Sequence, residues 1–384
     1  MTSSTVNSKT ERFRALSSLR FVAAILIVLC HFHYIFWPWD VWGPFEDFSA
    51  VVSFFLMLSG FMLTLAYGPM TWPQAGRFIT LRLARIWPLH LLMLGVTFWL
   101  LPIIRDQTMT LKESTSILWA SIFLLQAWLP VQDYFFSFNV ITWYLSTLLA
   151  CYLAFPLLIR NFAQTWPWKL GVGLLLLVGA FGLSLDKPLF AHHGISGQGW
   201  LYVSPLSRMF EFIVGMCAAL FYQWLQSRYP KTMGQATVLE ALALLLVGLA
   251  MASSSVMAHL LGHIPIWGKL LTYYASFAGA TLFPFFLLLI VFAMERGYFS
   301  RLLAHPAPVL LGELSFGIYL MHVTLIHLWL YPVALKPHAP MPTPEKITIY
   351  FLVLLALSYC SWRFIEKPVA AFVARRFPSG PQKT

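Results

Sequence analysis

The sequence predicts an all-α membrane protein, a polytopic helical bundle of about ten transmembrane helices. Its 384 residues are 59% hydrophobic and only 10% charged, whereas a soluble domain carries about 25% charged residues. Ten separate apolar runs approach or exceed the length of about 20 residues that a helix needs to cross a bilayer. Composition and run length together exclude an ordinary soluble globular protein.

The predicted spans follow one another without a soluble domain between them. They cover residues 19–37, 49–67, 86–104, 139–159, 168–185, 203–225, 236–257, 273–294, 309–331 and 346–366. We therefore expect one transmembrane domain at 19–366, a cytoplasmic segment at 1–18 and a cytoplasmic tail at 367–384. A further apolar run at 116–129 is short, which is typical of a re-entrant or interfacial segment.

Basic residues set the predicted orientation. With ten spans, 18 of the 25 Lys and Arg residues fall on the side of the two termini, which the positive-inside tendency assigns to the cytoplasm. Counting 116–129 as a span would move the basic C-terminal tail outside. We expect both termini in the cytoplasm and interpret the net charge of +11 as topological, with no nucleic acid as a partner.

The first span carries the leading candidates for chemistry. Arg20 and His31 are eleven residues apart, so on a helix they are offset by only about 20° and separated by about 16 Å along the axis. This places a cation at the membrane surface and an imidazole near the bilayer centre, where an ionisable residue is a functional candidate. Desolvation keeps such an imidazole neutral, the form that a general base needs. A structural histidine is the alternative, and His33, His322 and His327 compete with His31.

A second cluster consists of Arg77, Arg82 and Arg85, just before Pro88, where we expect the third span to open. Arg82 and Arg85 are three residues apart and share a helix face. Guanidinium forks match phosphate oxygens, so this pair suits a nucleotide-like ligand at the cytosolic surface. The alternative is a topogenic cluster in contact with lipid headgroups.

Other polar residues lie inside the predicted spans. Arg208 and Glu211, near the outer end of the sixth span, either neutralise one another or line a vestibule for an acceptor substrate. A set of small or polar residues is favoured for helix packing and hydrogen bonding: Ser59, Gly60, Ser315 and Tyr319. His322 is retained as a substrate-binding candidate.

Neither a metal site nor a disulfide framework is expected. The four cysteines, Cys30, Cys151, Cys217 and Cys360, lie in apolar runs without a CxxC pair or Cys/His spacing. We also expect no permanently bound cofactor.

Five motifs stand in order along nearly the whole chain. They are LSSLRFVAAILIVLCH at 16–31, FFLMLSGF at 54–61, RLARIWPLH at 82–90, SPLSRMFEFIVG at 204–215 and GELSFGIYLMH at 312–322. Together they resemble the acyltransferase 3 family, whose members are integral membrane proteins, many of which O-acetylate cell-surface carbohydrates.

The resemblance implies roles for particular positions. The family's arginine and histidine, separated by ten residues, fall on Arg20 and His31, and its paired arginines fall on Arg82 and Arg85. It implies acetyl-CoA approached from the cytoplasm and a histidine essential for transfer.

Two positions depart from the family pattern. The family often reads LDGLR where this chain has LSSLR, so Ser17 replaces an acid. It also often has a Glu five residues after a Trp, whereas Leu148 follows Trp143. No residue here can be assigned the role of that acid.

The predicted function is a membrane O-acyltransferase that moves an acyl group, taken as acetyl, from cytosolic acetyl-CoA to a sugar hydroxyl. The acceptor would be an extracytoplasmic polysaccharide or lipid-linked saccharide, and the location the bacterial inner membrane, in contact with lipid. Arg82 and Arg85, with Arg20, would hold the CoA phosphates. His31 would act as general base or carry the acetyl group.

Two alternatives remain open at this point. A secondary transporter or glycolipid flippase also uses buried Arg, Glu and His residues along its substrate pathway. The second alternative is the same enzyme with succinyl-CoA as donor.

Overall fold

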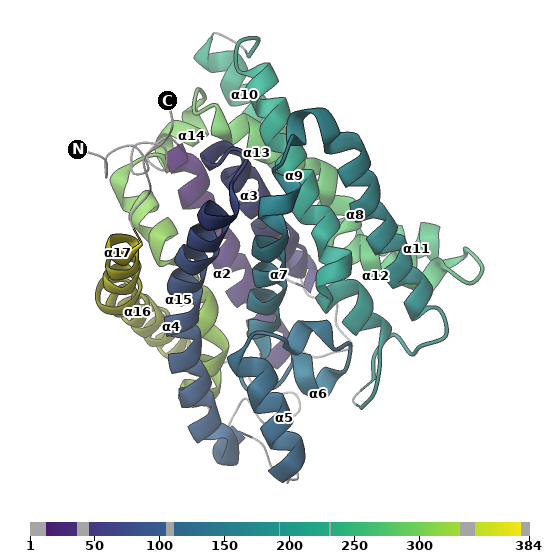
Figure 1. Ribbon diagram of the computed structural model, residues 1–384, viewed down its shortest axis with the longest axis vertical. Helices are drawn as coiled ribbons and strands as arrows, with labels where there is room; N and C mark the ends of the chain where they lie inside the picture. Colours follow the sequence, from purple (N-terminus) through teal and green to yellow (C-terminus); the bar gives the residue numbers. More distant parts are fainter. Residues whose placement is uncertain are drawn as a thin grey trace.

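Long apolar helices dominate the computed structural model of the protein (Figure 1). It describes residues 13–36, 46–104, 111–191, 193–229, 232–330 and 342–377. Within these ranges nine helical stretches are long and apolar enough to cross a membrane, or ten if one bent helix pair counts as a span. The same ranges contain no strand. The prediction of an all-α bundle of about ten spans is confirmed.

The spanning helices are α2 (Arg14–Phe36), α3 (Val51–Ala66), α4 (Trp72–Ile104), α7 (Trp143–Leu158), α8 (Phe162–Ser184), α9 (Pro205–Leu225), α10 (Met233–Met251), α15 (Pro306–Leu330) and α16 (Pro344–Ser361). Shorter elements between them are η2 (Glu46–Ala50), α5 (Leu111–Ile122), η3 (Gln126–Trp128), α6 (Gln132–Phe135), η4 (Val140–Thr142), η5 (Gly199–Val203), α11 (Ser254–Gly262) and α14 (Tyr298–Leu303). The bent pair is α12 (Gly268–Phe277) with α13 (Leu282–Ala293), which η6 (Gly279–Thr281) joins at an angle of 49°.

The third span begins earlier than the sequence predicted. α4 starts at Trp72, so the three arginines lie within the helix and Pro88 lies inside it rather than at its start. The expectation that Pro88 opens the span was wrong because an apolar run ends where charges begin, whereas backbone hydrogen bonding continues through them. Transmembrane helices tolerate such a proline because neighbouring groups satisfy the freed carbonyl.

The last span also continues past its predicted end. A π-helical turn, η8 (Trp362–Glu366), joins α16 to α17 (Lys367–Arg376), and the whole stretch is helical. The two terminal segments predicted as cytoplasmic lie partly outside the described residues, namely 1–12 and 378–384.

The run at 116–129 does not cross the membrane as one helix. α5 ends at Ile122, and turns lead from there through η3 and α6 to η4. The last carbonyls of a helix have no intrahelical partners and must be satisfied when they lie away from water. Side chains of α4 meet this need: Trp87 donates its indole N–H to the Ile122 carbonyl at 2.8 Å, and a ring nitrogen of His90 lies 2.9 Å from the Ser121 carbonyl.

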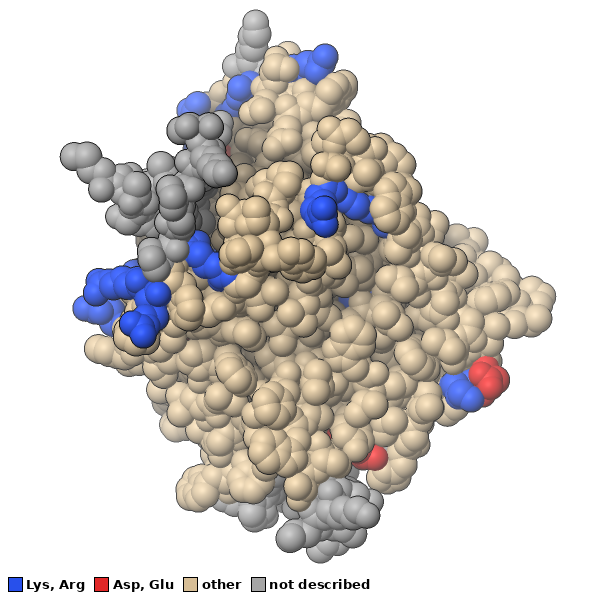
Figure 2. Space-filling model, in the orientation of Figure 1, with Lys and Arg blue, Asp and Glu red and all other residues tan. Residues whose placement is uncertain are grey.

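Charge divides the molecule into two ends. Figure 2 shows Lys and Arg gathered toward the end that carries α10, α14 and α17, whereas acidic atoms appear toward the opposite end of the same face. Between them the visible surface is almost free of charge. This division fits the predicted orientation, with the basic end in the cytoplasm.

Glycines let two pairs of helices approach at backbone distance. A Cβ on Gly60 of α3 would overlap the Phe212 carbonyl of α9, and one on Gly215 of α9 would overlap the Met57 carbonyl of α3. A Cβ on Gly312 of α15 would likewise overlap the Ser17 carbonyl of α2. Close contact through small residues drives helix association in membranes, and here it sets α15 directly against α2.

We expect Gly312→Ala to loosen this contact, because its methyl group would collide with backbone rather than with a flexible side chain. Overpacking of this kind costs about 1–3 kcal/mol. The apparent melting temperature in detergent, followed by tryptophan fluorescence, should fall. Gly179→Ala in α8, where a Cβ meets open space, is the matched control and should melt no earlier than the native protein. Equal melting of both variants would contradict the close contact.

Candidate active site

Two histidines from different helices meet inside the bundle. Nε2 of His322 on α15 lies 3.3 Å from Nδ1 of His31 on α2, with ring centroids 4.9 Å apart at 71°. His31 Nδ1 also lies 2.9 Å from the carbonyl of Ile27, and His322 Nδ1 lies 2.6 Å from that of Tyr319. His322 is fully buried and His31 is partly exposed. The structure therefore joins the predicted catalytic histidine to a residue predicted for substrate binding.

Three hydrogen bonds, to α16 and to the start of η4, hold this part of α15. Tyr350 of α16 donates its hydroxyl proton to the His322 carbonyl at 3.1 Å. Tyr319 donates to a backbone carbonyl of η4 at 2.9 Å, and Asn139 donates its amide to the Leu320 carbonyl at 2.8 Å. These donors are buried, so they hold the histidine helix by bonds that water does not contest. The sequence analysis missed Asn139 and Tyr350, whose only signal was a polar group near the start of an apolar run.

Arg20 lies near the start of α2, on the side of the basic end. Its charged neighbours include Arg85, Glu313 and Arg82, so the three predicted phosphate-binding arginines gather in one place. Within the described part of the chain, the Arg20 guanidinium makes no hydrogen bond or ion pair. Glu313 is the neighbouring acid, and its own contact is with Lys367 at 4.0 Å. A surplus of positive charge at this point favours an anionic ligand.

Aromatic side chains fix Arg82. Its guanidinium donates to the Tyr67 hydroxyl at 3.0 Å, and its central carbon lies 5.3 to 5.9 Å from the ring centroids of Tyr67, Phe78 and Tyr152. Its Nε is buried without a partner among the described residues, whereas Arg85 is exposed. Arg82 is thus a preoriented fork, and Arg85 can swing toward a ligand from water.

Arg208 and Glu211 form a completely buried ion pair in α9. Arg208 also donates to the Tyr202 carbonyl at 2.7 Å and to the Ser53 hydroxyl at 3.2 Å. The rings of Trp143, Tyr202 and Phe277 surround its guanidinium at 4.8 to 5.7 Å. The two charges neutralise one another and tie α9 to α3, and neither side chain is open to a substrate in this structure.

Comparison with known proteins identifies the family. A sequence profile described as an acyltransferase domain matches residues 13–363 of the chain. The chain belongs to the acyltransferase 3 family. It is also 28% identical over 254 residues to the acyltransferase MdmB of Streptomyces mycarofaciens, an alignment that covers 60% of this chain and 62% of that protein. No solved structure matches the chain.

Family membership gives the histidine pair a chemical context, because the profile that the chain matches is that of an acyltransferase domain. The matched region contains both histidines, His31 and His322, and the arginines Arg20, Arg82 and Arg85. Acyl transfer to a hydroxyl needs a base for the hydroxyl proton, and the partly exposed His31 can meet a substrate.

The residues at the two positions where the family often has an acid take part in helix packing here. Leu148 is buried in the apolar core, and the backbone carbonyl of Ser17 faces Gly312 at the α2–α15 contact. Among the hydrogen bonds of the described residues, none joins His31 to a carboxylate. The partners of His31 Nδ1 in this structure are the backbone carbonyl of Ile27 and the imidazole of His322.

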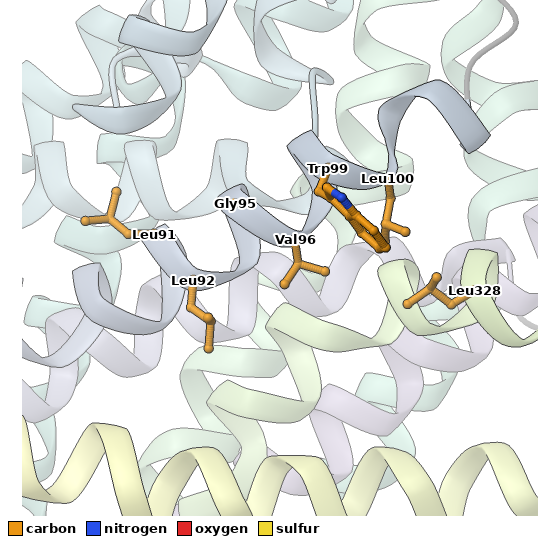
Figure 3. A pocket seen from close by; sticks show the side chains of 7 residues that line it. All are labelled: Leu91, Leu92, Gly95, Val96, Trp99, Leu100 and Leu328. Carbon is orange, nitrogen blue, oxygen red and sulfur yellow. The ribbon is translucent and has the colours of Figure 1, made fainter.

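An apolar groove lies outside this polar site (Figure 3). It has a volume of about 520 Å³, and its wall consists of α4 residues between Leu91 and Leu100 together with Leu328 of α15. The Trp99 ring forms one side of it and is three-quarters exposed. No lining side chain can transfer a proton or hold a phosphate, so this groove suits contact with lipid and not the reaction.

We expect Arg208→Leu to lower the apparent melting temperature of the protein in detergent, because it leaves Glu211 buried without a counter-charge. Breaking a buried pair on one side costs about 3–5 kcal/mol. The double variant Arg208→Leu/Glu211→Leu removes both charges and should recover part of the loss in melting temperature. The single variant Glu211→Leu completes the comparison. If the double variant loses as much melting temperature as the two single variants lose together, the two charges are not coupled.

Proposed function

We propose that this acyltransferase moves an acetyl group from cytosolic acetyl-CoA to a sugar hydroxyl on the opposite side of the membrane, with His31 as the base. The observation that carries the proposal is the placement, on one face of α2, of Arg20 beside the two α4 arginines and of the partly exposed imidazole of His31. By helical rise, Arg20 and His31 are about 16 Å apart. The CoA phosphates would bind at the arginines while the pantetheine arm carries the thioester inward.

Each element of the site has a chemical task in this scheme. Arg20, Arg82 and Arg85 bind phosphate oxygens through charge-assisted hydrogen bonds. The acceptor oxygen attacks the thioester carbonyl, and His31 takes the hydroxyl proton and then returns it to the departing CoA sulfur. General base catalysis contributes about 10²–10⁴ in rate, and positioning of the two substrates contributes more. An acetyl group carried transiently on His31 is the covalent form of the same scheme.

The acceptor side is the less constrained part of the proposal. We propose a polysaccharide or lipid-linked saccharide and a location in the bacterial inner membrane, as the chemistry of the family suggests. The acceptor role predicted for Arg208 and Glu211 stays a prediction, because a substrate could reach the buried pair only after the surrounding rings move. Mass spectrometry of surface glycans from a deletion strain and its parent would identify the acceptor and the acyl group, acetyl or succinyl.

A transporter without acyl transfer is the alternative class. Membership of an acyltransferase family weighs against it. Purified protein should release free CoA from acetyl-CoA in the presence of acceptor; transport of the saccharide without thioester loss would support the rival. Succinyl-CoA in the same assay tests the donor.

We expect His31→Ala to reduce kcat by at least about 10²-fold with little change in the KM for acetyl-CoA, because the variant lacks the base but keeps the phosphate site. Release of free thiol measures this. His259→Ala, at an exposed histidine, is the control. Full turnover by a correctly folded His31→Ala enzyme would assign the chemistry elsewhere.

We expect Arg85→Ala to raise the KM for acetyl-CoA by about 10- to 100-fold, the range of one charge-assisted hydrogen bond. Acetyl-pantetheine, which lacks the nucleotide phosphates, should be used equally well by the native and variant enzymes. Arg77→Ala is the control. Arg77 donates to the Phe377 carbonyl at 2.6 Å, and the charged neighbours of Arg20 are Arg82, Arg85 and Glu313. An equal rise in KM for acetyl-CoA and acetyl-pantetheine would show that Arg85 does not bind the phosphates.

A further inference from the structure

The contacts of the histidine pair decide which nitrogen carries each proton. The Tyr319 carbonyl can only accept, so His322 Nδ1, 2.6 Å away, carries a hydrogen. A neutral imidazole has one N–H, which leaves His322 Nε2 as an acceptor. The hydrogen in its 3.3 Å contact must therefore belong to His31 Nδ1, which also faces the Ile27 carbonyl at 2.9 Å.

This assignment leaves one nitrogen of the pair without a role in the fold. His31 Nε2 keeps its lone pair and has no hydrogen-bond partner in the described part of the chain. The side chain that carries it is the partly exposed one, whereas His322 is fully buried. The basic atom of the site is thus the nitrogen that a substrate can reach.

We propose that His322 is the positioning residue of this acyltransferase: together with the Ile27 carbonyl it accepts the His31 Nδ1 hydrogen, and so it keeps the ring oriented with Nε2 toward the acceptor hydroxyl. In hydrolases with a Ser-His-Asp triad a carboxylate accepts the Nδ1–H of the histidine and fixes its orientation. Here a neutral imidazole and a backbone carbonyl share that task. The inference rests on the proposed role of His31 and adds to it the reacting atom and the side chain that orients it.

The pair also offers a path for the positive charge. When the acceptor proton reaches His31 Nε2, the Nδ1 proton can shift to His322 Nε2, whose ring then donates to His31 and to the Tyr319 carbonyl. As the tetrahedral intermediate collapses, the Nδ1 proton returns to His31 and the CoA sulfur takes the other proton from His31 Nε2, so the pair is regenerated.

Two amide substitutions separate positioning from mere packing. In His322→Gln the amide oxygen can reach the place of Nε2 and accept from His31 Nδ1. In His322→Asn the amide nitrogen can take the place of Nδ1 and donate to the Tyr319 carbonyl, but the Ile27 carbonyl is then the sole acceptor left for His31 Nδ1 among these contacts. We expect the Gln variant to keep kcat within about 10-fold and the Asn variant to lose about 10- to 100-fold more, the range seen for lost orienting partners, with the KM for acetyl-CoA unchanged in both. His259→Gln, at an exposed histidine outside the site, is the control.

Equal kcat in the two variants, or a more active Asn variant, would overturn the assignment. A purely structural role would lower melting temperature and kcat together and would not distinguish Gln from Asn.

A second readout needs no turnover. In protein with ¹⁵N-labelled histidine, the His31 signals, identified by their loss in His31→Ala, should show a protonated Nδ1 and a bare Nε2. His322→Asn should shift the His31 Nδ1 signal, because one of the two acceptors of its hydrogen is lost. A protonated His31 Nε2 in the native protein would overturn the inference. Failure of the proposed acyl transfer would appear separately, as native protein that never consumes acetyl-CoA.

Discussion

The contact between α2 and α15 is the constraint on which the site depends. Gly312 has no side chain to hold the two helices apart, so the backbone of α15 reaches the Ser17 carbonyl of α2. Ten residues further along α15, His322 then meets His31 at hydrogen-bond distance. The contact between the two histidines is possible because the backbones of α2 and α15 already lie close together at Gly312.

The need to satisfy backbone groups away from water explains much of the remaining polar structure. Where α5 ends inside the protein, two side chains of α4 bond its last carbonyls. Where the chain turns between α5 and η3, Ser146 of α7 donates its hydroxyl to the Leu124 carbonyl at 2.5 Å. Irregular backbone at membrane depth is tolerated only when protein or a water-filled cavity surrounds it. The residues around α5 are therefore better explained by capping than by catalysis.

Arg208 and the arginines around Arg20 differ in what balances their charge. Arg208 has Glu211 and a set of aromatic rings, so its charge is balanced within the protein, although Arg208 Nη2 and Glu211 Oε2 make no hydrogen bond among the described residues. The cluster around Arg20 has three arginines beside Glu313 and Glu366, and Arg82 Nε is buried without an acceptor among the described residues. An anion brought by a substrate would balance the remaining charge of the second site. This difference supports a phosphate-bearing donor at the basic end.

The sequence by itself determined the class of the protein, the approximate positions of its spans and the alignment of Arg20 with His31, because these follow from composition and from the fixed geometry of a helix. It did not place the start of α4 at Trp72, since charges interrupt an apolar run without interrupting hydrogen bonds. Only the tertiary structure showed that His322 is the partner of His31 and that Arg208 and Glu211 are closed off from solvent. Such contacts join residues up to 291 positions apart, and one chain's local pattern carries no record of which distant helix will pack against it.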